Sequence, residues 1–171
     1  MKIEAFEQGT PPLALEDFFS GDVEAWGMFV DRFGSMRRQF KLDIKGTWNG
    51  GHLTLAEHFF YTDGESQRRM WHITKTSRAS YEGRAEDVEG VAKGQIAGNA
   101  FNWTYNLNLR MFGRTVRVQV DDWMFLQHGG VLINRATMTK FGFELGTLEA
   151  FFRRKNADPV SASELSARFA A

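Results

Sequence analysis

Short runs of alternating apolar and polar residues dominate the chain from Val23 to Arg154. Glycine-rich turn signals separate these runs at Gly34, Asn49-Gly50-Gly51, Asp63-Gly64, Gly98-Asn99, Gly113 and Gly129-Gly130. Strict alternation places one set of side chains on each face of a strand, and regularly spaced turn residues indicate consecutive hairpins. No part of this stretch repeats with the period of a helix. The pattern predicts an all-β fold, an antiparallel up-and-down barrel of about eight or nine strands.

The two ends of the chain depart from this alternation. Four apolar residues, Leu13, Leu15, Phe18 and Phe19, cluster before Ser20-Gly21. They predict one helical turn that plugs an end of the barrel, within an N-terminal capping segment, 1–22. After Pro159, the run Ser161-Ala-Ser-Glu164 matches a capping box and predicts a short C-terminal helix in a tail, 156–171. The chain has no internal repeat or linker, so residues 1–171 are interpreted as a single domain.

Turn length fixes which side chains share a face, because a shift of one residue moves a strand's apolar set to the other side. Matching the apolar faces on either side of Asp63-Gly64 requires an odd loop, and Thr62-Asp63-Gly64 fits a type I turn followed by a left-handed glycine. This register sets Leu55 opposite Trp71. It also sets Glu57 opposite Arg69 on a face that is otherwise apolar.

The later turns predict further cross-strand pairs. A two-residue turn at Gly98-Asn99 sets small residues against large rings, pairing Ile96 with Phe101, Gly94 with Trp103 and Ala92 with Tyr105. A turn at Phe112-Gly113 pairs Tyr105 with Val120 and Trp103 with Asp122, and a three-residue loop at His128-Gly129-Gly130 pairs Asn134 with Met124 and Met138 with Val120. Small residues opposite large ones are typical of a barrel interior. Gly90, Ala92 and Gly94 are expected to thin one wall and leave some space.

Composition narrows the class of protein. The chain has 16 Phe, 5 Trp and 17 Gly but only 3 Pro, which suits strands joined by tight turns around an aromatic interior. It has no Cys, so disulfides and thiolate sites are excluded. Lys and Arg total 21 and so do Asp and Glu, a balance that argues against nucleic-acid binding. The start of the sequence has no secretory-signal pattern and no run approaches the length of a membrane-spanning helix, so a cytoplasmic location is expected.

Several separated motifs resemble one bacterial family. These are Asp121-Asp122-Trp123-Met124, Leu132 to Ala136, Lys140-Phe141-Gly142, Gln67 to Trp71 and Gly94 to Trp103. Together they cover the chain from about Leu15 to Arg153 and are similar to domain of unknown function 3833. The resemblance implies a lipocalin-like architecture. It also implies a lipid context, since members are often encoded near genes similar to cyclopropane-fatty-acid synthases. Many members begin with a lipoprotein signal that this sequence lacks, and the family supplies no catalytic residues.

The sequence offers little support for metal or covalent chemistry. The four histidines are His52, His58, His72 and His128, and even the nearest pair is six residues apart, roughly 20 Å on a strand and far beyond shared metal coordination. No Ser occupies a Gly-x-Ser-x-Gly elbow, and Gly90 to Gly94 lacks the spacing of a phosphate loop. No metal and no cofactor are therefore expected.

The inward faces define the candidate site. Its polar members are Glu57, Arg69, Asp122 and Asn134, and its apolar and aromatic members are Phe59, Tyr61, Trp71, Trp103, Tyr105 and Met138. Aromatic walls can hold an alkyl tail while an arginine grips a carboxylate head group, so the main interpretation is binding of a hydrophobic small molecule, fatty-acid-like, in support of membrane-lipid modification. There are two alternatives without a ligand. The polar residues could form a network with only a structural role, and side chains could fill the interior and leave no cavity.

Two other functions stay open. The first is a lipid-modifying enzyme that uses Asp122 or Glu57 as acid–base, because burial raises the pKa of a carboxyl group, with Tyr61 or Tyr105 assisting. The second is a ligand-free interaction module. The partner expected under the main interpretation is a lipophilic molecule. Peripheral contact with a membrane or with a lipid enzyme is left open, as is the oligomeric state.

Overall fold

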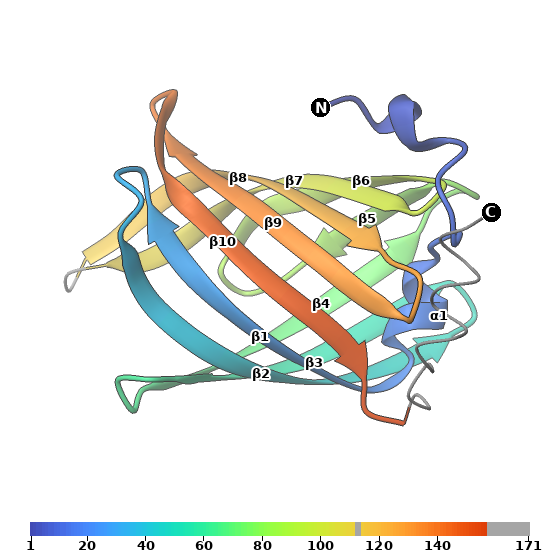
Figure 1. Ribbon diagram of the computed structural model, residues 1–171, viewed down its shortest axis with the longest axis horizontal. Coiled ribbons are helices and arrows are strands. Elements are labelled where there is room, and N and C mark those ends of the chain that lie inside the picture. The colour runs from blue at the N-terminus through green and yellow to red at the C-terminus, as the bar shows by residue number, and fades with distance from the viewer. Residues whose placement is uncertain (112–113, 157–171) are drawn as a thin grey trace.

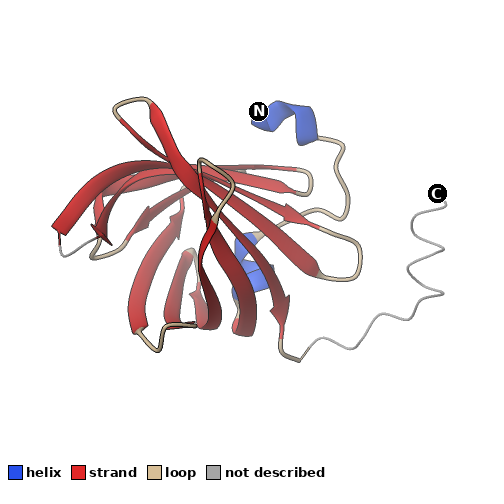
Figure 2. Cartoon of the chain, turned by 60° about the vertical axis from the view of Figure 1, so that its left-hand side comes forward, coloured by secondary structure: helices blue, strands red, loops and turns tan. Residues whose placement is uncertain are grey.

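The computed structural model describes residues 1–111 and 114–156. Strands make up most of the described chain, and two short helices precede the first strand (Figure 2). In chain order, the elements are η1 (Ile3–Phe6), α1 (Leu15–Phe19), β1 (Gly21–Asp31), β2 (Met36–Asn49), β3 (His52–Tyr61), β4 (Ser66–Lys75), β5 (Ser80–Arg84), β6 (Val88–Ala97), β7 (Ala100–Met111), β8 (Arg114–Leu126), β9 (Val131–Lys140) and β10 (Phe143–Arg154). Neither helix is long and apolar enough to cross a membrane.

The strands form one closed antiparallel barrel in which each strand pairs with its neighbours in sequence and β10 pairs back onto β1 (Figure 1). The all-β, up-and-down fold is confirmed. The described residues contain ten strands rather than eight or nine, and β5, with only five residues, is the shortest of them. The predicted C-terminal helix and the Phe112-Gly113 turn lie outside the described residues.

The hairpin registers agree with those argued from the turns. Leu55 pairs with Trp71 and Glu57 with Arg69 across β3 and β4, and Gly64 has a φ of +85° at the end of its three-residue loop. The other predicted pairs, with one exception, are also present: Ile96–Phe101, Gly94–Trp103, Tyr105–Val120, Trp103–Asp122, Met124–Asn134 and Val120–Met138. Period-two alternation was therefore sufficient to assign the inward face of most strands.

Strand β6 is the exception. Its register with β7 shifts between Glu89 and Lys93, so the predicted pairing of Ala92 with Tyr105 is wrong. Gly90 sits in this bulge with a φ of +75° and is exposed, so it does not thin the inner wall. Ala92 and Gly94 are buried as expected. The shift amounts to two residues, since Glu89 pairs with Asn106 but Lys93 pairs with Thr104. Val88 before the bulge and Ala92 and Gly94 after it therefore all stay on the inward face, and the glycine that permits the bulge gives no sign of it in the sequence.

Helix α1 lies at the end of the barrel opposite the β1–β2 and β9–β10 turns (Figure 1). Leu15, Phe18 and Phe19 are buried. A Cβ atom added to Gly46 would lie 1.6 Å from the carbonyl oxygen of Phe19, so only glycine lets the helix approach this closely. Helix α1 is also held by Glu16, which pairs with Lys75 and accepts a 2.8 Å hydrogen bond from the Tyr81 hydroxyl.

The short β5–β6 hairpin leaves a notch in the wall at the other end. Strand β4 begins at Ser66, but its pairing with β5 runs only from His72 to Lys75. Strand β7 continues to Met111, whereas its pairing with β6 ends at Leu107. Within the described chain, the outer stretches of β4 and β7 thus flank an opening, and the loop containing Asp87 forms its floor.

Candidate ligand-binding site

An internal cavity of about 140 Å³ occupies the barrel. All ten residues predicted for the site line it: Glu57, Phe59, Tyr61, Arg69, Trp71, Trp103, Tyr105, Asp122, Asn134 and Met138. Leu15 and Phe19 of α1 also contribute to its lining. The matched faces of the sequence therefore identified side chains that converge in space, although they come from five different strands.

Packed aromatic rings fill most of the interior. The ring centroids of Trp71 and Trp103 are 4.6 Å apart, and Tyr105 lies edge-on to Trp71 at 5.4 Å. A Cβ atom on Gly83 would lie 2.5 Å from the Trp103 ring, so the absence of a side chain there makes room for the indole. The remaining space is close to the roughly 150 Å³ of an apolar cavity that accepts benzene. The interior is therefore neither filled nor large.

Arg69 lies at the centre of the polar part of the cavity, and its main partner is one that the sequence did not reveal. Its Nε and Nη2 atoms donate hydrogen bonds of 2.6–3.1 Å to Asp87 on the β5–β6 loop. Glu57, the predicted partner, lies across the strand pair but its nearest oxygen is 3.8 Å from Arg69. Glu57 and Arg69 therefore form an ion pair without a hydrogen bond, because the guanidinium fork donates to Asp87.

Glu57 is consequently a poorly compensated buried acid. Its side chain is 11% exposed, and its Oε2 atom has no hydrogen-bond partner among the described residues. Burial raises the pKa of Glu57 to about 7; the charge of Arg69 opposes this shift, and the charges of Asp87 and Asp122 add to it. Near neutral pH this carboxyl group is therefore divided between its protonated and ionised forms.

Asp122 is held by neutral donors. Asn134 Nδ2 donates to one of its oxygens, and the Tyr105 hydroxyl donates to the other at 3.3 Å. Within the described chain no Lys or Arg forms an ion pair with it. Burial raises the pKa of Asp122 to about 6, although the hydrogen bonds oppose the shift. Trp103 Nε1 is close enough to lower this pKa, yet it completes no hydrogen bond.

The two partly buried tyrosines of the cavity, Tyr61 and Tyr105, are donors, not bases. Burial, followed by the charge of Asp122, raises the pKa of Tyr105 well above its usual value. Burial likewise raises the pKa of Tyr61, against the opposing charges of Arg38 and Arg69. Both hydroxyl groups therefore stay protonated at neutral pH. Tyr105 uses its proton to bind Asp122, and Tyr61 donates to Gln67 at 3.2 Å.

The cavity continues outward into a groove of about 590 Å³ at the open end of the barrel. Its apolar lining consists of Phe29, Phe40, Phe59, Tyr61, Leu109, Met138, Leu145 and Leu148. Arg37, Arg38 and Arg110 stand at its polar edge. A second, more polar opening of about 810 Å³ lies over the notch and shares Tyr61, Leu109 and the three arginines with the groove.

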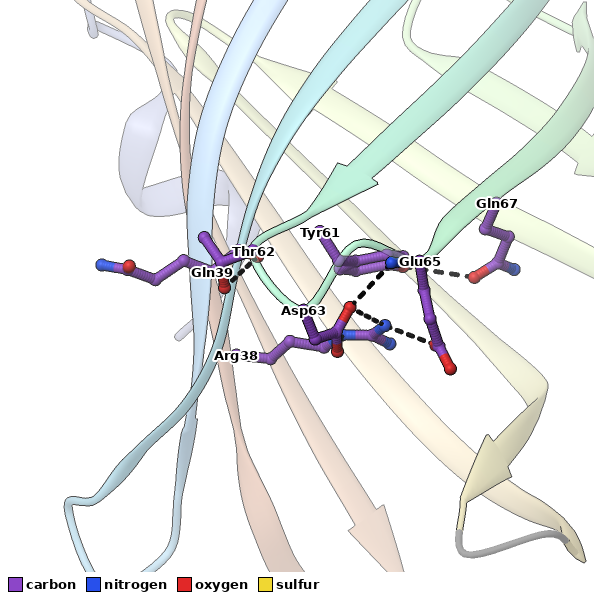
Figure 3. Close-up of polar contacts among 7 residues, drawn as sticks. All are labelled: Arg38, Gln39, Tyr61, Thr62, Asp63, Glu65 and Gln67. Carbon is purple, nitrogen blue, oxygen red and sulfur yellow. Dashed lines mark hydrogen bonds and ion pairs between the residues drawn. The ribbon is translucent and has the colours of Figure 1, made fainter.

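Carboxylates at the β3–β4 turn hold one of these arginines in place. Arg38 reaches from β2 to Asp63 and to Glu65, while Tyr61 points to Gln67 beside them (Figure 3). Arg37 pairs with Asp31. Arg110 is exposed and has no ion pair with any described residue. Arg110 is thus the rim cation that is available to a ligand.

Asp87 and the rim arginines are not among the residues predicted from the sequence, for different reasons. Asp87 lies in a three-residue loop after the short β5, and nothing in local periodicity links it to Arg69, 18 positions earlier. The alternation in β2 and β7 does place Arg38 and Arg110 near strand ends, which could have identified them as rim residues. In the described ranges, no group of three His, Asp or Glu side chains is arranged to hold a metal ion.

Comparison with known proteins agrees with this architecture. The family model described as "Protein of unknown function (DUF3833)" matches residues 1–154. No curated protein sequence matches the chain. Among solved structures, the S-type phycobiliprotein lyase of Guillardia theta is similar, with a TM-score of 0.64 and 10% sequence identity over 92% of this chain and 100% of that chain. This likeness supports a lipocalin-like barrel and concerns the fold alone. From the family match, the chain belongs to the DUF3833 family of proteins of unknown function.

Proposed function

We propose that this barrel binds a hydrophobic small molecule, a fatty-acid-like lipid, with its alkyl tail running from the open groove into the internal cavity. The observation that carries the proposal is a continuous apolar lining. Six residues line both the groove and the cavity: Phe40, Phe59, Tyr61, Leu109, Met138 and Leu148. Apolar area supplies affinity in such sites, while a few placed polar groups fix orientation.

The volumes assign different parts of the ligand to the two spaces. Ligand pockets usually measure about 300–1,000 Å³, a range that the groove reaches and the internal cavity does not. The groove therefore takes most of the tail, and the cavity takes its end, beside Trp71 and Trp103. The barrel shared with the phycobiliprotein lyase supports the coarser part of the proposal, a small molecule held inside a barrel.

The head group is assigned to Arg110 at the rim. Arg69, the partner expected from the sequence, already donates hydrogen bonds from Nε and Nη2 to Asp87 and lies in the polar part of the cavity. Arg110 is exposed, so its attraction for a carboxylate is about 1 kcal/mol at most, or roughly fivefold in affinity. The proposal includes a role in support of membrane-lipid modification, which is the lipid context that the family resemblance implies.

Titration with fatty acids and with matched fatty alcohols, followed by tryptophan fluorescence, tests the proposal. Leu148→Phe narrows the junction between groove and cavity and is expected to weaken both ligand classes about tenfold or more, since it excludes several methylene groups. Leu126→Phe is the matched control, because Leu126 packs against the core but lines neither space. Absence of binding by the parent protein, or equal weakening in both variants, would contradict the proposal.

A second candidate function is an enzyme acting on the bound lipid, and the protonation of Glu57 favours it. A carboxyl group with a pKa of about 7 is suited to general acid–base chemistry near neutral pH. Asp122, with a pKa of about 6, is the second acid in the same cavity. Here the tyrosines would donate hydrogen bonds rather than accept protons. Conversion of a bound lipid that is lost in Glu57→Gln and retained in Leu126→Phe would support the enzyme over a carrier.

A further inference from the structure

The most exposed aromatic residues of the barrel are concentrated on two hairpin tips. Phe141 is 88% exposed, Phe33 is 76% exposed and Phe143 is 69% exposed, and Met36 beside them is also exposed. Phe33 lies in the β1–β2 turn and Met36 is the first residue of β2, while Phe141 lies in the β9–β10 turn and Phe143 is the first residue of β10. Burial in this chain does not explain why such large apolar side chains occupy these positions, because none of them contributes to the core.

The backbone at Phe141 strengthens this point. Lys140 pairs with Phe143, so Phe141 and Gly142 form a two-residue turn, and their φ angles are +51° and +78°. Turns with two positive φ angles favour Asn-Gly, and a bulky residue in the first position is strained. Phe141 is the one described residue other than glycine with a positive φ. An aromatic ring is thus kept at a site where the fold itself favours asparagine, which points to a role outside folding.

The two tips lie side by side at the open end of the barrel. Strands β1 and β10 pair directly, and Arg32 N–H donates to the carbonyl oxygen of Leu145 at 3.0 Å. Both turns project from the left-hand end of the barrel in Figure 1, opposite α1. The groove opens at this end, between walls that include Phe29 and Leu145. The exposed rings therefore border the mouth of the barrel.

Positive charge accompanies these rings. Segments 31–37, 110–114 and 140–144 carry five cationic residues, Arg32, Arg37, Arg110, Arg114 and Lys140, against two acidic ones, Asp31 and Glu144. The β3–β4 turn at the same end adds Asp63 and Glu65, which pair with Arg38, so cationic residues outnumber acidic ones there by six to four. The chain as a whole has a net charge of +0, so this excess is local. Arg32 lies over the Phe33 ring at 4.6 Å, and Lys140 lies over the Phe141 ring at 5.3 Å.

We propose that the mouth end of the barrel, through Phe33, Phe141 and Phe143 and the cations beside them, docks onto the surface of an anionic lipid bilayer. Rings on protruding tips can enter the boundary between head groups and acyl chains, while arginine and lysine contact anionic head groups. A protein partner would need a broad, contiguous patch, whereas these rings stand on separate turns around an opening. Docking is independent of the proposed lipid binding, because it is measured without a ligand in the barrel.

The test is partition of the full chain onto vesicles of phosphatidylcholine mixed with phosphatidylglycerol, measured by flotation. Phe141→Asn removes the ring and creates the Asn-Gly turn that the backbone favours, so its thermal stability should equal or exceed that of the parent protein. Its partition coefficient should nevertheless fall about tenfold, because one of the inserting rings is lost. Phe151→Ser, at an exposed phenylalanine on the outer wall toward the closed end, is the control and should partition as the parent does.

Parent binding should also weaken in vesicles of phosphatidylcholine alone and at high salt, because screening reduces the attraction of surface charges. Equal partition of Phe141→Asn and the parent protein would overturn the proposal. So would an equal loss in Phe151→Ser, or binding that does not depend on the anionic lipid. The parent protein could instead fail to bind vesicles and self-associate, through Phe141, in sedimentation experiments. In that case the tips form a protein contact and the membrane assignment is wrong.

Discussion

Glu57→Gln should stabilise the barrel at alkaline pH. Glu57 is buried, its Oε2 atom lacks a hydrogen bond, and the nearest cation, Arg69, is already held by Asp87. Ionisation of Glu57 therefore places a charge in the cavity wall with little compensation. Glutamine keeps the volume and the polarity of the side chain but never ionises, so it isolates the cost of this charge.

The size of the effect follows from the pKa shift. The pKa of Glu57 is about 7 in the folded protein and 4.5 for an unperturbed glutamate. Between these values the folded state binds more protons than the unfolded state, so the stabilisation is complete below pH 4.5 and is lost as pH rises through 7. The full shift corresponds to about 3 kcal/mol. Asp122 shifts in the same direction, but its loss is complete at lower pH, because its pKa is about 6.

Urea unfolding of the parent protein and Glu57→Gln at pH 5 and pH 8 measures this difference. The two proteins should have free energies of unfolding within about 1 kcal/mol of each other at pH 5, and the variant should be more stable by about 3 kcal/mol at pH 8. Glu82→Gln, at an exposed position of β5, is the matched control and should show no such divergence. A variant that is less stable than the parent at pH 8 would refute the argument, because it would mean that ionised Glu57 is well compensated.

Three further substitutions test the contacts that hold the barrel together, each by its free energy of unfolding in urea. Gly46→Ala should destabilise the protein by several kcal/mol, because its Cβ atom would collide with the backbone of Phe19 and displace α1; retained stability would show that α1 is not docked there. Tyr81→Phe removes the hydrogen bond to Glu16 and should cost about 1 kcal/mol, whereas an unchanged value would remove this contact from the account. Asp87→Asn leaves Arg69 without its main ionic partner and should cost about 2 kcal/mol; no loss of stability at pH 8 would show that Glu57 takes over the pairing.

The sequence predicted those features that depend on alternation within a hairpin. Glu57 faces Arg69, and Asn134 faces Met124, because loop parity and apolar faces leave one consistent register for each pair. The same reasoning brought ten side chains from separate strands to one cavity. Local patterns thus carry long-range information when strands follow each other around a barrel.

Features that depend on irregular backbone or on ring packing could not be predicted in this way. The bulge at Gly90 interrupts the register of β6, and the loop behind β5 carries Asp87 to Arg69 without any periodic signal. The size of the cavity depends on how Trp71, Trp103 and Tyr105 tilt against one another, which alternation does not specify. The groove forms from the ends of several strands, so its lining became apparent only in three dimensions.

The depth at which an alkyl tail lies in the barrel distinguishes a tail that enters the cavity from one that stays outside it. Fatty acids carrying bromine near the tail end or near the carboxylate can be compared as quenchers of tryptophan fluorescence in the parent protein and in a variant with Trp71→Phe and Trp103→Phe. The account predicts strong quenching by tail-end bromine in the parent, weaker quenching by bromine near the carboxylate, and loss of this difference in the variant. Equal quenching by both acids, or stronger quenching from the carboxylate end, would contradict a tail that points into the barrel.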